Sequence, residues 1–256
     1  LFDANGPWAG HLDIRHFTSG GRNPPEEYDR ITGVTTKPIL ILASNSPRRR
    51  ELLALGNWMF HVQPAEVDES EHPGEAPGDY VLRLAESKAR ACAARAHSGQ
   101  TIVAADTTVA LDGEILGKPA SMAEAVAMLR RLRGRSHQVY TGLAVLRMVD
   151  GKLLTDLCAT EVPMRGYSDE ELEAYVLSGD PLDKAGAYGI QHAGFHPVEG
   201  LQGCFASVMG LPLCHLVRTL RQLEVAPHAD VPGECQATLH YQCPIFRQVL
   251  RGEQVG

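Results

Sequence analysis

The segment from Ser44 to Arg50 has the residues needed to bind a phosphate. It reads SNSPRRR and follows four large apolar residues at 39–42, a pattern typical of a strand covered on both faces. Pro47 suits the first position of a helix, which makes Ser46 the expected N-cap. A helix N-terminus attracts anions, whereas arginines in its first turn oppose the helix dipole. A bound phosphate would remove that conflict; the alternative is a solvent-exposed basic patch.

An aspartate and a lysine stand out by their positions in predicted elements. Asp106 follows the apolar run TIVAA, a predicted strand at 101–105. Open α/β sheets bind ligands at the C-terminal ends of their strands, although a turn aspartate leading into a hairpin is the alternative. Lys88 lies on the otherwise apolar face of a predicted helix at 79–96. It either extends its ammonium to solvent or pairs with a buried anion.

Two further segments combine cations with backbone freedom. Lys118 lies in the turn GKP, and Asp183 and Lys184 precede Gly186 and Gly189. Glycines of this kind let a loop backbone approach a ligand closely. These segments suit a phosphate-rich ligand.

The acidic run Glu66, Asp68 and Glu69 could supply oxygen ligands to Mg²⁺. The alternative is a solvated acidic loop. Together with the cations and glycine-rich loops, it suits a polyphosphate bound with a divalent metal, where in-line attack needs charge neutralisation and a positioned water. The sequence has no GxxxxGKS/T motif, so a P-loop mechanism is unsupported.

Strands and helices alternate in the part of the chain that carries these residues. The patterns predict strands at 39–43, 60–63, 101–105, 137–146 and 153–162, and helices at 47–55, 79–96, 122–133, from 168 to before 179, and 212–223. The segment VALDGEIL predicts a hairpin with Asp112 and Gly113 in a type I′ turn. This alternation, with hairpins, predicts an α/β fold with a mixed sheet.

Composition indicates a globular chain of one or two domains. Its 256 residues are 44% hydrophobic and 21% charged, with a net charge of −7, which argues against a protein that coats nucleic acid. No run of about 18 apolar residues is present, which predicts no membrane span. The chain begins without Met and lacks a hydrophobic signal segment, so we expect a fragment or processed form of a cytoplasmic protein.

Three parts are expected along the chain. Residues 1–36, rich in Gly, Pro and Asn, predict a poorly ordered N-terminal extension. The core is expected at 37–225. Residues 226–256 predict a C-terminal extension whose last apolar stretch could dock as an appendage.

The six cysteines are scattered singly, which favours buried thiols over disulfides. Cys235, His240 and Cys243 could form a partial metal cluster, although no fourth ligand is nearby in the sequence.

Six segments carry a resemblance to a known family. In chain order they are SNSPRRRELL (44–53), ESKA (86–89), AADTTVALDGEILGKP (104–119), RLRGRSHQVYTGLAV (131–145), SGDPLDKAGAYGIQ (178–191) and VMGLP (208–212). They closely resemble the Maf family of nucleoside triphosphate pyrophosphatases, over about residues 37–225. The resemblance implies an elongated α/β fold of the Maf and ITPase-like kind, with a mixed sheet flanked by helices and two lobes around a deep cleft. It also implies cleavage of a nucleotide to monophosphate and pyrophosphate with Mg²⁺ or Mn²⁺, often by a homodimer.

The same resemblance implies roles for the charged residues. Asp106 of the ADT motif would be the catalytic carboxylate, as proton acceptor or metal ligand, and Glu69 its acidic, metal-binding partner. Lys88 and Lys118 would neutralise the phosphates, Lys88 as part of the catalytic set.

The remaining matches concern substrate binding. Ser46, Arg48 and Arg49 of SPRR would hold the triphosphate. Arg48, Thr107 and Gln191 match positions associated with base specificity. Asp183 and Lys184 belong to the matched glycine-rich loop and are predicted to contact the substrate.

The family has a branch acting on dTTP and UTP and another acting on 7-methyl-GTP. The latter carries SDQ and a Cys-Ala-Gly-Ser loop, where this chain has Ala-Asp-Thr at 105–107 and Lys-Ala-Gly-Ala at 184–187. The chain therefore resembles the dTTP/UTP branch, whose substrates could extend to modified pyrimidine nucleotides. The segment QHAGFHPVEGLQGC, from Gln191 on, departs from the family pattern in its length and its two histidines.

Two other functions compete with this one. One is regulation, because the family is also described as an inhibitor of septum formation and cell division. Asp106, Lys88 and Lys118 favour the enzyme, because a pure binding protein would not need them. The other is a pyrophosphatase for 7-methyl-GTP or deaminated purines, which Thr107 and Gln191 disfavour. We expect a nucleoside triphosphate as the partner, no nucleic acid, no membrane, and a homodimer in the cytoplasm.

Overall fold

The structure is a computed structural model that describes residues 39–256. The predicted N-terminal extension, 1–36, lies outside the described residues. The described residues belong to one compact unit, Pro38–Gly256.

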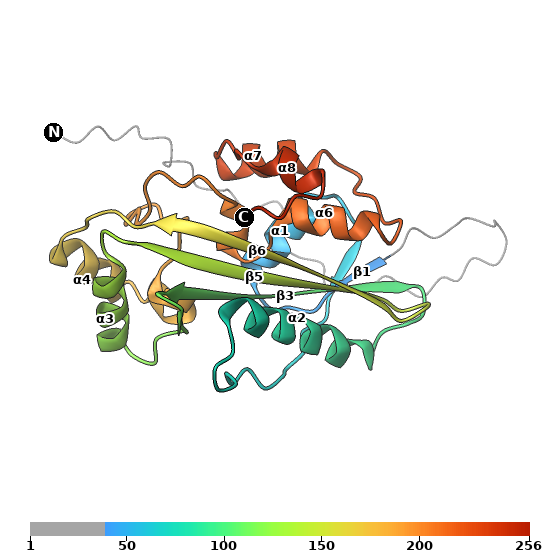
Figure 1. The fold of residues 1–256 in the computed structure, drawn as a ribbon, viewed down its shortest axis with the longest axis horizontal. Coiled ribbons are helices and arrows are strands. Elements are labelled where there is room, and N and C mark those ends of the chain that lie inside the picture. The colour runs from blue at the N-terminus through green and yellow to red at the C-terminus, as the bar shows by residue number, and fades with distance from the viewer. Residues whose placement is uncertain (1–38) are drawn as a thin grey trace. The chain divides into compact units, whose positions relative to one another are not determined.

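A six-stranded mixed sheet forms the centre of this unit (Figure 1). Its strands are β1 (Ile39–Leu42), β2 (Phe60–Val62), β3 (Gln100–Leu111), β4 (Glu114–Leu116), β5 (Ser136–Arg147) and β6 (Lys152–Pro163). Their order is β2-β1-β3-β5-β6, with β4 paired to β3. β1 pairs in parallel with β2 and β3, and the other pairs are antiparallel. The predicted α/β fold with a mixed sheet is confirmed.

Helices cover both faces of the sheet, as Figure 1 shows. They are α1 (Pro47–Ala54), α2 (Pro77–Ala93), α3 (Met122–Leu132), α4 (Asp169–Leu177), α5 (Phe205–Met209), α6 (Leu213–Arg221), α7 (Val231–Leu239) and α8 (Phe246–Leu250). Alternation along β1 divides the core: Ile41 packs with α2, whereas Leu40 and Leu42 pack with α1 and α6 on the opposite face. A strand with apolar residues on both faces needs this double cover.

β3 is longer than the sequence predicted. It continues past Asp106 to Leu111 because β5 has the same length and pairs with it from Thr101 to Ala110. The expectation that Asp106 ends its strand is therefore wrong, and the aspartate lies inside β3. The predicted turn is confirmed, since φ is 54° at Asp112 and 84° at Gly113.

The neighbouring strand β1, unlike β3, does end near Asp106. β1 pairs with β3 only as far as Val103, and β4 begins to pair at Val109. Among the described residues, no strand pairs with residues 104–108 on the edge of β3 away from β5. This opening in the sheet gives access to the middle of β3 from the side, and it is called the β3 gap below.

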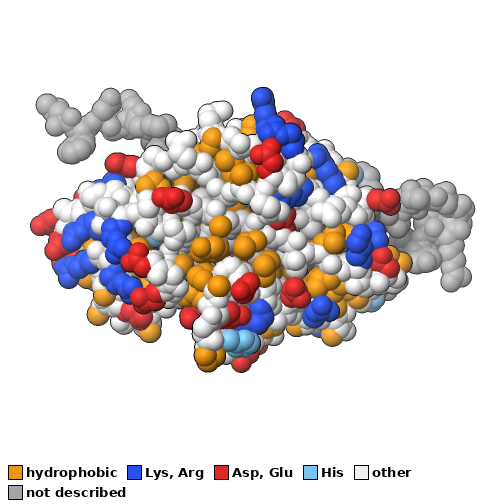
Figure 2. All heavy atoms as spheres, viewed as in Figure 1, with side chains coloured by type: hydrophobic (Ala, Val, Ile, Leu, Met, Phe, Trp, Pro, Cys, Tyr) orange, Lys and Arg blue, Asp and Glu red, His pale blue; other side chains and the backbone are white. Residues whose placement is uncertain are grey.

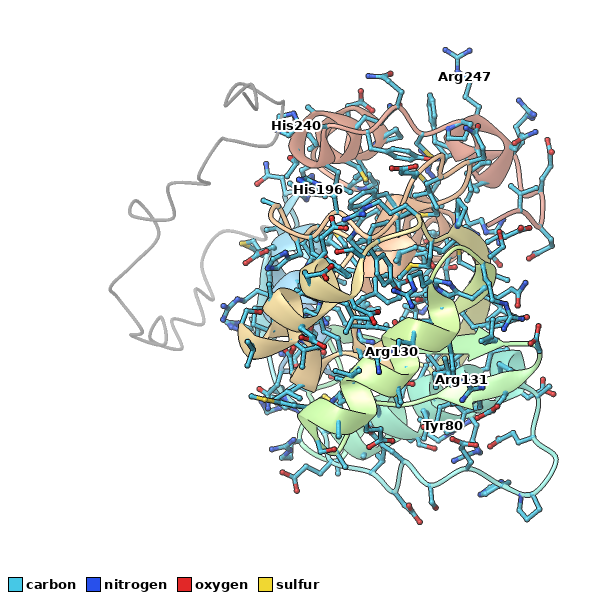
Figure 3. The ribbon with its side chains drawn as sticks, turned by 90° about the vertical axis from the view of Figure 1, so that its left-hand side faces the viewer. Tyr80, Arg130, Arg131, His196, His240 and Arg247 are labelled. Atoms are coloured by element: carbon cyan, nitrogen blue, oxygen red, sulfur yellow. The ribbon has the colours of Figure 1, made fainter. Side chains whose placement is uncertain are left out.

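The arginines at the α3–α4 end of the unit are paired with carboxylates. Figure 2 shows Lys and Arg side chains gathered at the end where Figure 1 places α3 and α4, and Figure 3 labels Arg130 and Arg131 on α3. Arg130 lies 3.2 Å from Asp169, and Arg131 lies 2.6 Å from Glu114. These cations therefore have neighbours of opposite charge.

Residues 226–256 contain two helices that the sequence patterns did not predict. α7 and α8 pack against α6, and Figure 3 labels His240, which follows α7, and Arg247 of α8. Arg218 of α6 adds polar contacts, because it donates to the carbonyl of Val249 in α8 at 3.4 Å and to that of Glu253, beyond α8, at 2.6 Å. The same arginine pairs with Asp156 of β6 at 2.5 Å.

Residues 39–256 contain neither a membrane-spanning helix nor a cluster of metal-ligating side chains. None of the helices there combines the length and apolar character that a membrane span requires. The same residues include no group of three or more His, Cys, Asp or Glu that could hold a metal ion. The suggested cluster of Cys235, His240 and Cys243 is therefore not a metal site in this structure.

Candidate active site

A cleft of about 640 Å³ opens at the β3 gap. The residues to which the family resemblance gives a role all line it: Ser46, Arg48, Arg49, Glu69, Lys88, Asp106, Thr107, Lys118, Asp183, Lys184 and Gln191. They come from segments spread over the chain, and the fold brings them to one place. Of the acidic run, Glu66 and Glu69 line the cleft, whereas Asp68 does not.

Lys88 lies between two carboxylates. Its Nζ is 2.5 Å from Oδ1 of Asp106 and 2.6 Å from Oε1 of Glu69. Lys88 is 8% exposed and Asp106 7%, so the pair is largely removed from water. Of the two possibilities for a lysine on an apolar helix face, the structure shows pairing with a buried anion. Two carboxylates and one cation thus meet at a single point.

A glycine in β5 allows α2 to bring Lys88 to this point. Gly142 is the register partner of Asp106. A Cβ at Gly142 would lie 2.6 Å from the carbonyl oxygen of Val81 in α2, closer than real Cβ contacts allow. Because the glycine has no side chain, the helix backbone rests on the sheet. Lys88 follows Val81 by about two turns on the same helix face.

The loop that carries Glu69 is tied to α2. The hydroxyl of Tyr80 donates to the carbonyl of Glu69 at 2.9 Å, and Figure 3 labels Tyr80 on this side of the molecule. Arg83 donates to the carbonyl of Ser70 at 3.0 Å and pairs with Glu75 at 2.6 Å. Sequence patterns did not reveal Tyr80, because a tyrosine on a helix has no distinctive spacing.

Opposing effects set the charge state of the Glu69 carboxyl. Burial raises its pKa, but the hydrogen bond from Lys88 and the charges of Lys88, Lys118 and Arg49 outweigh burial and lower it overall. Burial, and the neighbouring charges of Asp106 and Glu69, raise the pKa of Tyr80 to about 12. Glu69 is therefore ionised and Tyr80 neutral near pH 7.

Arg49 also lines the cleft and is held there by several hydrogen bonds. Ser46 is the N-cap of α1 and accepts from the backbone N–H of Arg49. The guanidinium donates to the Gly210 carbonyl at 2.8 Å, to Ser44 Oγ at 3.3 Å and to Thr107 Oγ1 at 3.1 Å. Burial lowers the pKa of Arg49, against the raising effect of Asp106. The predicted N-cap is confirmed, and the arginine presents its charge along the cleft wall.

Gly210 is required where it stands for two reasons. It ends α5 with φ of 113°, in the left-handed region that favours glycine. A Cβ there would also lie 3.3 Å from Nε of Arg49. The sequence segment VMGLP contained this glycine, but its contact with Arg49 spans 161 positions and no local pattern indicates it.

Lys184 is occupied by protein acceptors. Its Nζ donates to the Asp180 carbonyl at 2.7 Å, to Asp180 Oδ1 at 3.0 Å and to Asp183 Oδ1 at 2.6 Å. An ammonium group has three N–H donors, so this set uses all of them. Tyr175 donates to Asp180 and accepts from the N–H of Gly189. The lysine therefore holds the glycine-rich loop together, with Asp180 and Tyr175 as partners that the sequence did not indicate.

Comparisons with known proteins cover the segment that forms the cleft. A family model described as "Maf-like protein" matches residues 39–223. A dTTP/UTP pyrophosphatase of Geobacter sulfurreducens is 48% identical over 184 residues, 72% of this chain and 96% of that protein. One of Myxococcus xanthus is 50% identical over 184 residues, 72% of this chain and 92% of that protein. Among solved structures, a nucleoside-triphosphatase / dITP/XTP pyrophosphatase from Mycobacterium abscessus aligns with a TM-score of 0.32 and 16% identity, over 49% of this chain and 74% of that chain.

Proposed function

This chain belongs to the Maf family, and we propose that it hydrolyses dTTP and UTP to the nucleoside monophosphate and pyrophosphate. The relatives named as dTTP/UTP pyrophosphatases support both the substrate and the reaction. The observation that carries the residue assignment is the contact of Asp106, Lys88 and Glu69 in a cleft that cations also line.

The triphosphate is assigned to the cationic wall. Ser46 and the N-terminus of α1 offer N–H groups and a positive dipole end, and Arg48, Arg49 and Lys118 line the same cleft. Together they neutralise a polyphosphate that a chain of net charge −7 would otherwise repel. Lys184 supports this binding indirectly by holding its loop.

The reaction cleaves the anhydride bond between the α- and β-phosphates. A water attacks the α-phosphorus in line, a new phosphorus–oxygen bond forms, and the bond to the bridging oxygen breaks as pyrophosphate leaves. Asp106 accepts the proton of the attacking water. Lys88 neutralises the developing charge and orients the Asp106 carboxylate through their 2.5 Å contact.

A divalent cation is part of the proposal, and the donor set fits one. Asp106 and Glu69 each place one carboxylate oxygen on the Lys88 ammonium group, which leaves each carboxylate a second oxygen for a cation. Mg²⁺ is typically held by one or two carboxylates together with substrate phosphates. Asp106 and Glu69 would hold Mg²⁺ or Mn²⁺, which would supply charge neutralisation at the phosphates when bound.

Base selection is assigned to Thr107 and Gln191, both of which line the cleft. A side-chain amide offers an N–H donor, so Gln191 can donate to the O4 that thymine and uracil share. Cytosine presents a donor at N4 instead.

A panel of nucleoside triphosphates tests the proposal. Pyrophosphate release is measured with Mg²⁺, with Mn²⁺ and after chelation. We expect dTTP and UTP to be hydrolysed faster than dCTP, CTP and 7-methyl-GTP, and activity to disappear with the chelator and return with the metal. Faster hydrolysis of CTP or 7-methyl-GTP would overturn the substrate assignment, and full activity in the chelator would overturn the metal.

The homodimer and the cytoplasmic location stay predictions. Size-exclusion chromatography with light scattering on the full chain would test the dimer.

A further inference from the structure

We propose that Thr141, a buried residue behind the cleft, sets the base preference by keeping the hydroxyl of Thr107 an acceptor toward the substrate. The inference rests on the proposed function, because it concerns the base that this cleft binds. Thr141 is a positioning residue, since it acts through Thr107.

The two threonines are joined across the sheet. Thr107 of β3 and Thr141 of β5 are register partners, and their Oγ1 atoms are 2.9 Å apart. Thr141 is fully buried at 0% exposure, whereas Thr107 is partly exposed and lines the cleft. Thr107 thus connects the interior of the fold with the ligand site.

Both ends of this hydrogen-bonded chain have a fixed direction. At one end, Nη2 of Arg49 lies 3.1 Å from Thr107 Oγ1, and a guanidinium group can only donate. At the other end, Thr141 Oγ1 lies 2.9 Å from the carbonyl oxygen of Ser207, which can only accept. A hydroxyl has one proton, so Thr141 gives its proton to Ser207 and accepts from Thr107.

The hydrogen bonds that Thr107 can still make follow from the proton and the two lone pairs of its hydroxyl. Its proton goes to Thr141, and one lone pair accepts from Arg49. One lone pair is left, so Thr107 faces the cleft as an acceptor only. Any arrangement in which Thr107 donates to a substrate breaks its bond to Thr141.

An acceptor at this position favours bases that carry a ring N–H. Thymine and uracil are protonated at N3, whereas the N3 of cytosine is itself an acceptor. Two acceptors facing each other leave a polar group unpaired, which typically changes affinity by about tenfold or more. The hydrogen-bonded series Arg49–Thr107–Thr141–Ser207 therefore selects nucleotides of the imide bases thymine and uracil against cytosine nucleotides.

Removing the Thr141 hydroxyl should remove the preference for thymine and uracil over cytosine. In Thr141→Val, which keeps the size of the side chain, the Thr107 proton is free to turn toward the cleft and donate to cytosine N3. Thr141→Ser keeps the hydroxyl and is the matched control.

The test measures binding, so it does not depend on turnover. Affinities for the α,β-methylene analogues of UTP and CTP are determined by calorimetry for the full chain and its variants. We expect the wild type and Thr141→Ser to bind the uridine analogue at least about tenfold more tightly. Thr141→Val should reduce that ratio by about tenfold. A ratio within twofold of the wild type in Thr141→Val, or equal weakening of both ligands, would overturn the inference.

A second variant, at position 107, tests the inference if the substitutions at position 141 prevent folding. Thr107→Val should also abolish the preference, and a preserved ratio in it would overturn the inference equally. If the wild type releases no pyrophosphate from dTTP or UTP, the proposed function fails, while the binding ratio still decides the role of Thr141.

Discussion

Asp106 and Gly142 face each other across β3 and β5, so the proposed catalytic carboxylate lies opposite the glycine on which α2 rests. The carboxylate of Asp106 and the absence of a side chain at Gly142 are both needed for the contact between Lys88 and Asp106. Asp106 supplies the anion, and the bare backbone at 142 lets α2 bring Lys88 within 2.5 Å of it.

Gly142→Ala should displace α2 and separate Lys88 from Asp106. The new Cβ would meet the Val81 carbonyl at 2.6 Å, and such overpacking typically costs about 1–3 kcal/mol. We expect a lower melting temperature and a loss of kcat/KM of more than about tenfold. Gly166→Ala is the control, because nothing lies within 4 Å of its added Cβ. Wild-type activity in Gly142→Ala would show that the helix position is not critical.

Asp106→Asn should abolish turnover and preserve the fold. Loss of a general base typically lowers the rate by about 10²–10⁴, and the amide keeps the size of the side chain. Pyrophosphate release and the melting temperature are measured together. Asp112→Asn is the control, since it makes the same change in the exposed hairpin turn, where φ of 54° suits Asn. A rate within a few-fold of wild type would move the catalytic role to Glu69.

Lys88→Met should lower both activity and stability. The methionine keeps most of the bulk but leaves the buried Asp106 carboxylate without its cation, which typically costs about 3 kcal/mol. We expect kcat/KM to fall more than about tenfold. The double variant Lys88→Met with Asp106→Asn should regain most of the stability in urea unfolding, though not the activity. If the single variant is as stable as the wild type, Lys88 does not compensate Asp106.

His137 should make the fold weaken in mild acid. It is fully buried beside Tyr188, and burial lowers its pKa from 6.5 to about 4. Between these values the unfolded chain binds a proton that the folded chain does not, so stability falls as pH decreases through this window.

From pH 7 to pH 5 the loss attributed to His137 is about 2 kcal/mol. It is measured as the free energy of unfolding of the wild type minus that of His137→Gln at each pH. The exposed residue His61 provides the control variant, His61→Gln, which should keep the wild-type pH dependence. Equal pH dependence in the wild type and His137→Gln would show that this histidine is not the cause.

The sequence indicated three of the cations of the cleft because each conflicts with its local environment. Lys88 lies on an apolar helix face, and Arg48 and Arg49 oppose a helix dipole. Such conflicts are visible without a structure and are expected at functional sites. Apolar periodicity found the helices around them, including the one predicted from 168, which begins as α4 behind a capping box formed by Ser168 and Glu171.

The partners of these residues could not be found in this way. Whether β3 stops before Asp106 or passes it depends on pairing with β5, which local apolar patterns do not describe. The contact of Arg49 with Gly210, and that of Thr107 with Thr141, likewise exist only once the sheet and α5 are assembled. α5 and α8 are five residues long, too short for a helical period to emerge.

The β3 gap also bears on how this sheet avoids aggregation. Unpaired strand edges attract strands of other molecules, and residues 104–108 form such an edge among the described residues. Here the edge is only a few residues long and is bounded by the end of β1 and by β4. A foreign strand would have to enter between them, so the opening admits a small molecule but offers no template for a growing sheet. The sheet is thus interrupted in a place where its exposed backbone carries little risk of misassembly.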